Sequence, residues 1–442
     1  MLQTLINAFK VKEIRRKVYM MLLLLLVFRI GCFIPVPGLI RDTFGTAVSN
    51  NDFLTLMSSI TGGALSQGTI FALGIGPYIN ASIIMQLLSV GIPALERLSK
   101  QGEEGRKKIA QYTRYVTILL AIIQSVGIIV SFGNSQNAIQ TSLFGGEDFL
   151  WLAGTFMAIV YTAGALIVMW LGERITDYGV GNGQSMIIFV GILATAGNLI
   201  VGKFETIFAG GDAGITAIWE LVAFMLVSVV VFFAIIYVDL SERKVPVQYA
   251  KQIKGRKMYG GQSSSIPIRI SGGGVMPLIF AFSILSFPQM ICSLVDPNAE
   301  GWFTQFWNGW MSATAEWPQS IVYAFVLCLL IFAFSFFYAQ MQFNPEDVSK
   351  SIQQNGGFIQ GIRPGKATEN YLKKISNRIT LFGAIYLSLV AFIPPVAFGW
   401  AAPDLVNVFS TTGILIVVSC AMELEKQLQA QLMMKNYKGF LK

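Results

Sequence analysis

The stretch ALGIGPYINASIIMQLL, residues 72–88, is apolar along most of its length but contains two glycines and a proline near its start. Apolar residues continue on both sides, and about 20 such residues are enough to cross the hydrocarbon core of a bilayer. Glycine and proline weaken or interrupt a helix. Unpaired backbone inside a membrane is tolerated only where protein or a water-filled cavity covers it. The stretch therefore predicts a membrane segment that is either kinked among packed helices or broken beside an internal path.

The whole chain has the composition of a polytopic membrane protein. Of its 442 residues, 54% are hydrophobic and 13% are charged, whereas soluble domains carry roughly 25% charged residues. The first apolar run resembles a signal peptide, but Arg29 interrupts it and no small-residue cleavage site follows, so we expect a retained span. Apolar windows predict ten spans, at 18–34, 69–92, 115–132, 149–171, 183–201, 215–238, 273–291, 318–339, 377–393 and 406–423.

The basic residues predict how these spans are oriented. Of the 32 Lys and Arg, all but Arg29, Arg41 and Lys203 lie at the two ends of the chain or in every second loop. Because Lys and Arg accumulate on the cytoplasmic side, both termini are predicted to be cytoplasmic, which requires an even number of crossings. Two of the basic loops, 239–272 and 343–376, are long and polar. Composition leaves open whether they are solvated loops or a docking surface for an acidic or RNA-containing partner.

A second interruption opens the seventh span, where residues 272–277 read GGGVMP. The irregular helix is then second in each set of five spans. Matching Gly/Pro-interrupted segments in two halves are typical of inverted-repeat membrane proteins with a central pathway. We therefore expect two pseudo-symmetric halves, residues 1–201 and 202–442.

The chain has no histidine, which excludes histidine-based proton relays, HExxH metal sites and Ser-His or Cys-His nucleophiles. An intramembrane enzyme is therefore disfavoured. The four cysteines lie far apart without a CxxC pair and are expected to be packing residues. Acidic residues are nearly absent from the spans, which argues against a proton-coupled pump. An ion-coupled transporter of a small solute and a lipid or polysaccharide flippase remain alternatives at this point.

Seven stretches, in order, resemble the SecY-type protein-conducting channel over nearly the whole chain. They are FRIGCFIPVPG (28–38), GGALSQGTIFALGIGPYINASIIMQLL (62–88), EEGRKKIAQYTRY (103–115), WLGERITDYGVGNGQS (170–185), YAKQIKGRKMYGGQSSSIPIR (249–269), FNPEDVSKSIQQNGGFIQGIRPG (343–365) and ILIVVSCAME (414–423). The resemblance implies an all-α polytopic membrane protein. Its ten transmembrane helices would form two five-helix halves, arranged as a clamshell around a central hourglass pore.

The same resemblance implies a function. Unfolded preproteins carrying signal peptides would cross the plasma membrane through the pore, and hydrophobic helices would leave sideways into membrane lipid. The SecA motor ATPase or the translating ribosome would supply the energy, so the channel itself would be no enzyme and would need no cofactor. The small membrane subunits SecE and SecG would complete the complex.

The family's pore constriction is a ring of apolar side chains. The resemblance assigns it to Ile75 and Ile79 in the second span, Gln184 and Ile188 in the fifth, Ile279 in the seventh and Ile416 in the tenth. The first two pairs are each four residues apart and so share a helix face. Outside the family, each isoleucine would be read as a core or lipid-facing residue. Gln184 departs from the apolar pattern, which implies either a match that slips by one residue or a wetter seal.

Three further sites are implied by the resemblance. Residues 52–67 correspond to the plug that blocks the outer funnel at rest. A lateral gate is expected where the second and third spans face the seventh and eighth, with matching positions Asn80, Gln86, Gln124, Asn182 and Phe287. Docking of the motor or the ribosome is assigned to Lys251, Arg256, Lys257 and Arg363. Buried polar groups of this kind are also ordinary interhelical hydrogen-bond partners, and the basic residues also fit the topology rule.

Overall fold

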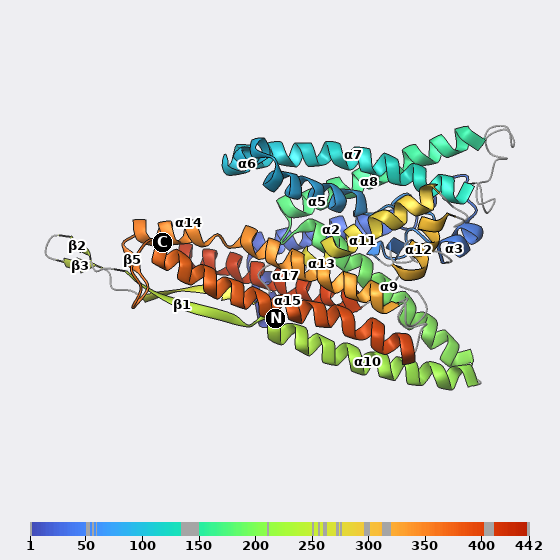
Figure 1. The fold of residues 1–442 in the computed structure, drawn as a ribbon. Coiled ribbons are helices and arrows are strands. Elements are labelled where there is room, and N and C mark those ends of the chain that lie inside the picture. Colours follow the sequence, from blue (N-terminus) through green and yellow to red (C-terminus); the bar gives the residue numbers. More distant parts are fainter. Residues whose placement is uncertain are drawn as a thin grey trace.

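The computed structural model is mostly helical (Figure 1). The structure describes residues 2–49, 54, 57–58, 60–133, 150–209, 212–249, 252–254, 257–259, 263–270, 274, 276–295, 301–311, 320–401 and 411–439. Ten helices overlap the ten predicted spans. They are α2 (Lys12–Gly31), α5 (Gly76–Gly91), α7 (Glu103–Gly133), α8 (Leu150–Tyr178), α9 (Gly183–Ala209), α10 (Asp212–Asp239), α11 (Met276–Val295), α13 (Ser320–Gln342), α15 (Lys366–Ala401) and α17 (Thr411–Gly439).

Shorter helices accompany them: α1 (Leu2–Lys10), α3 (Arg41–Ser49), α6 (Pro93–Lys100), α12 (Trp302–Trp310) and α14 (Pro345–Gln354). Within the described residues, five helices are by themselves long and apolar enough to cross a membrane, and α5 with α6 makes a sixth that bends by 105°. Charge occupies the start of α2, which reads KEIRRK before its apolar run.

The interruption at residues 74–77 neither kinks nor breaks a helix, because it lies at the start of one. Residues 61–75 form turns and α5 begins only at Gly76. Pro77 stands in the first turn, where its missing N–H would be unpaired in any case. Gly74 has a φ of 54°, a conformation that side chains disfavour. In the same way α11 begins at Met276, with Pro277 as its second residue.

The boundary between the halves is better placed after α9. The proposed division at residue 201 would cut this helix, which continues to Ala209, while α10 begins at Asp212. In Figure 1, α5, α7 and α8 lie along one side of the molecule and α10, α15 and α17 along the other. The largest buried cluster joins residues of α2, α8 and α9 to residues of α11, α13 and α17, so the main core extends across both halves.

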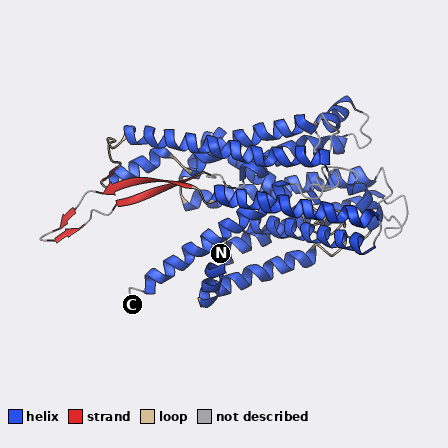
Figure 2. Cartoon of the chain, turned by 90° about the horizontal axis from the view of Figure 1, so that it is seen from below, coloured by secondary structure: helices blue, strands red, loops and turns tan. Residues whose placement is uncertain are grey.

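The two basic loops form strands, which the all-helical expectation did not include. Strand β1 (Glu242–Tyr249) pairs antiparallel with β4 (Ser263–Arg269) and with β5 (Gly357–Phe358) in the order β4-β1-β5. Beyond them, β2 (Gln252–Lys254) pairs with β3 (Lys257–Tyr259). The strands project past the helices at one end of the molecule (Figure 2).

Both loops also share a hydrophobic core with α14 and the start of α15. Its buried members are Val245, Val247, Ile268, Ile352, Ile359 and Leu372. We call β1, β4, β5, α14 and the first turns of α15 the loop platform. Because its core residues come from both loops, segments about 100 residues apart in the sequence form one packed unit.

Candidate functional site: an apolar waist and a seam

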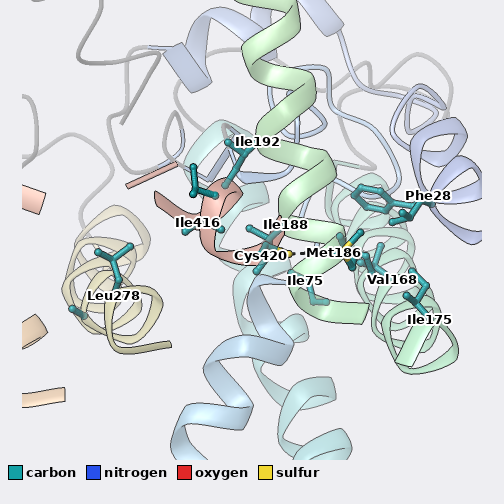
Figure 3. Packing of buried hydrophobic residues seen from close by; sticks show 14 of the residues in the cluster. Phe28, Ile75, Val168, Ile175, Met186, Ile188, Ile192, Leu278, Ile416 and Cys420 are labelled. Carbon is teal, nitrogen blue, oxygen red and sulfur yellow. Dashed lines mark hydrogen bonds between the residues drawn. The ribbon is translucent and has the colours of Figure 1, made fainter. Parts of the chain in front are cut away.

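The five isoleucines of the predicted ring belong to one hydrophobic cluster. Ile75, Ile188 and Ile416 are buried, with 3%, 4% and 7% of their surface exposed. Ile79 and Ile279 are partly buried and pack against the same cluster. Figure 3 shows Ile75, Ile188 and Ile416 on three separate elements around one apolar region. We call these five residues the waist.

Local geometry explains how the waist is assembled. Ile75 stands at the N-cap of α5, and the N–H of Ile79 donates to its carbonyl at 3.1 Å, so the two side chains occupy successive turns. Ile188 lies in α9 and Ile416 in α17, helices that pack on each other. Residues from both halves therefore meet at the waist.

Gln184 lies beside the waist, but its amide has a partner outside it. A Cβ atom at Gly172 of α8 would lie 3.4 Å from Ile75 Cδ1 and 3.5 Å from Gln184 Cγ, so both side chains lie against Gly172. The Gln184 side chain shares a hydrogen bond with Tyr78. A polar residue at this position is thus satisfied by a neighbouring side chain.

The predicted gate positions fall in different environments. Gln86 reaches the seam, by which we mean the line where α5 and α7 meet α11 and α13. Gln124 on α7 is buried, and within the described residues its Oε1 has no hydrogen-bond partner. Asn80 is partly buried on α5. Asn182 instead caps α9, because its Oδ1 accepts from the N–H of Gln184 at 3.1 Å. The side chain of Phe287 lies outside the described residues.

An aromatic residue that sequence reasoning missed completes the seam. Tyr338 of α13 donates its hydroxyl to Gln86 Oε1 at 2.7 Å. Its ring stacks on Phe280 of α11 with centroids 4.8 Å apart. Ile83 of α5 is buried in the same cluster. A tyrosine near the end of an otherwise apolar helix was the only signal available, because pairing across 252 residues cannot be read from spacing.

The predicted plug segment is folded against the first half. Ser58 and Thr61 are 8% and 4% exposed. Leu54 and Leu65 are buried with Leu73 in a second hydrophobic cluster. Residues 54, 57, 58 and 60 are helical, and residues 61–68 form turns and a bend. The segment is therefore held by packing and by local hydrogen bonds such as Thr61 Oγ1 to the Ser58 carbonyl at 3.1 Å.

Of the predicted docking residues, the structure describes Arg363 most fully. It is exposed on a turn flanked by Gly361 and Gly365, which have φ of 81° and 99°. Thr368 donates its hydroxyl to the Arg363 carbonyl, and Ser349 donates to the Gly365 carbonyl, each at 2.9 Å. The turn is thus braced from α14 and α15. Lys251 and Arg256 lie outside the described residues, as does the side chain of Lys257 in β3.

The arrangement of helices defines a helical membrane protein with two halves. The chain also matches known proteins along its whole length. The SecY family model matches residues 69–424. Protein translocase subunit SecY of Streptomyces coelicolor is 40% identical over 456 residues, and that of Bacillus subtilis is 38% identical over 444, with 100% of each chain covered in both cases. The chain belongs to the SecY family.

Solved structures share the fold. One is a SecY channel whose plug domain is described as stabilising the closed state, with a TM-score of 0.65, 21% identity and coverage of 94% of this chain and 92% of that one. Another is Sec61 in a canine ribosome-channel complex, with a TM-score of 0.58, 18% identity and the same coverage. The comparisons do not support the alternative of an ion-coupled transporter.

Proposed function

We propose that the chain is the channel-forming subunit of a preprotein translocase. It passes unfolded polypeptides across the plasma membrane and releases hydrophobic helices sideways into lipid. The observation that carries this proposal is the waist, where Ile75, Ile188 and Ile416 from three elements are buried together. A narrow apolar constriction resists ion flow by dewetting. Since aliphatic side chains need no specific hydrogen bonds, such a seal can fit a chain of any sequence.

The seam supports sideways release. The Tyr338–Gln86 hydrogen bond joins the two halves there, together with the stacking of Tyr338 on Phe280. Hydrogen bonds between membrane helices contribute only about 0.6 to 2 kcal/mol each. A hydrophobic signal helix can compete with adhesion of that size. The seam is therefore the lateral gate of the proposed channel.

The loop platform provides the docking surface for an energy source. Arg363 is presented there on a braced, exposed turn. By the distribution of Lys and Arg, the platform and both termini face the cytoplasm. The SecA motor or the ribosome docks on it, and the small subunits SecE and SecG complete the complex. Related channels are seen in ribosome complexes.

Reconstitution tests the function. Proteoliposomes containing the chain with SecE and SecG are given SecA, ATP and an unfolded precursor, and protease then digests whatever remains outside. We expect ATP-dependent protection of the precursor. The matched control replaces the signal peptide with a polar sequence of equal length, which should abolish protection. Equal digestion with and without ATP, in the presence of bound SecA, would contradict the proposal.

A further inference from the structure

The plug segment is held against two residues that neither the waist nor the seam uses. One is Gly191 in the middle of α9. Any side chain at this position would collide with the carbonyl of Ile60, and its Cβ would lie 3.4 Å from the N–H nitrogen of Gly62. The turn at residues 60–62 therefore rests directly on the backbone of α9. Only glycine allows this approach.

The second residue is Arg29, the basic residue inside the first span. Its Nη1 donates to the carbonyl of Gly62 at 3.4 Å, across 33 residues of sequence. Its guanidinium carbon also lies 5.4 Å from the centre of the Phe33 ring. Charged side chains within membrane segments are costly and usually functional. A cation near the end of α2 also suits the helix dipole, but that alone would not direct it to Gly62.

Gly62 connects the two contacts. It has a φ of 73°, and a Cβ there would lie 3.0 Å from the Gly191 carbonyl. The same turn is thus pressed against α9 on one side and bonded from α2 on the other. Both observations are independent, since one concerns backbone packing and the other a side-chain hydrogen bond.

We propose that Arg29 and Gly191 form the seat that keeps the plug segment in its closed position. Gly191 lets the turn approach α9, and Arg29 holds the turn through a main-chain carbonyl. A neutral carbonyl acceptor suits a plug segment that must leave Arg29 when the channel opens, because a carboxylate would bind the guanidinium more strongly. This inference rests on the proposed function, since it assumes that the segment closes a channel.

Two pairs of variants test the seat, each with a matched control. Gly191→Ala is compared with Gly197→Ala on the same helix, where a Cβ would meet nothing within 4 Å. Arg29→Gln is compared with Arg41→Gln, which removes an exposed basic residue from the loop after the first span. The complex with its small subunits is studied in planar bilayers and in proteoliposomes.

The readouts are resting ion conductance and labelling of a cysteine introduced by Ser66→Cys with a membrane-impermeant maleimide. Labelling is measured against the same protein without that cysteine. We expect Gly191→Ala and Arg29→Gln each to raise resting conductance and labelling rate several-fold, with precursor translocation retained. Both control variants should behave like the parent.

Three results would overturn the seat. These are an unchanged conductance in both test variants, a rise in only one of them, or an equal rise in the controls. Failure of the proposed function looks different, because the parent complex itself would then not translocate precursor. The parent protein therefore separates the two conclusions.

Discussion

Tyr338 and Gln86 are 252 residues apart in the sequence, yet the Tyr338 hydroxyl donates to Gln86 Oε1 at 2.7 Å. The bond joins α13 of one half to α5 of the other. Gln86 is itself oriented by a further bond, from its Nε2 to Ser82 Oγ at 3.2 Å. The pair is a polar contact placed at an apolar seam, where separation of the halves would break it.

Removing this hydroxyl should ease opening of the seam. Tyr338→Phe keeps the ring that stacks on Phe280 and removes only the donor. A loss of about 0.6 to 1.7 kcal/mol shifts the open-to-closed ratio by about threefold to about twentyfold. We expect precursors with weakly hydrophobic signal sequences to be exported faster. Tyr237→Phe, on the exposed surface of α10, is the control. Equal export rates in the two variants would show that the Tyr338–Gln86 hydrogen bond does not hold the seam closed.

Replacing the polar residue beside the waist should tighten the seal. Gln184→Ile adds an aliphatic side chain next to Ile75 and removes the partner of Tyr78. We expect lower resting ion conductance in planar bilayers. Gln184→Glu serves as the opposite control, since a carboxylate of similar size should raise conductance. An unchanged leak in both variants would mean that Gln184 does not border the ion path.

Reversing the charge on the braced turn should uncouple the motor. Arg363→Glu places a carboxylate on an exposed turn whose backbone is held by Thr368 and Ser349. Because no packing is lost, we expect membrane assembly to be intact and SecA-driven export to be abolished. Arg363→Lys, which keeps the charge, should retain part of the activity. Normal export by the glutamate variant would remove Arg363 from the docking surface.

Opening a cavity in the loop platform should loosen it without affecting the waist. Ile352 is 6% exposed and packs in the core that both loops share. Ile352→Ala should cost about 2 to 5 kcal/mol, as other large-to-small core substitutions do. We expect faster proteolysis within both basic loops and unchanged resting conductance. Gln354→Ala, exposed on the same helix, is the control, and cleavage confined to one loop would argue against a shared core.

Apolar periodicity and length located the membrane helices, because α7, α8 and α13 are continuous runs long enough to span a bilayer. Their ends were less accessible. Pro77 indicates that a helix is interrupted, but it does not indicate whether the helix lies before or after it. The structure shows that the helix begins at Gly76, after a run of turns. The strands β1 and β4 were missed because basic residues in ERKVPVQY obscure the alternation of buried Val245 and Val247.

Sequence reasoning placed the isoleucines of the waist through a family resemblance and not through their own pattern, since apolar residues are common everywhere in this chain. Gln86 accepts a hydrogen bond from Tyr338 across the seam, and this partner was not found from the sequence. Asn182 was assigned to the gate from the sequence, but the structure gives its side chain a local role. Its amide oxygen caps α9, and asparagine is a common N-cap residue, so this local role was an alternative to a role in the gate.

The shared core of the loop platform connects the ends of several helices of the second half. The ends of α10 and α11 lead into the β1–β4 hairpin, while α13 and α15 are joined through α14 and β5. The same hydrophobic core therefore connects one end of each of these four helices. In the first half, the second hydrophobic cluster joins loop residues such as Val36 and Leu65 to α7 and α8 instead. We expect the four connected helices of the second half to move together when the pore widens.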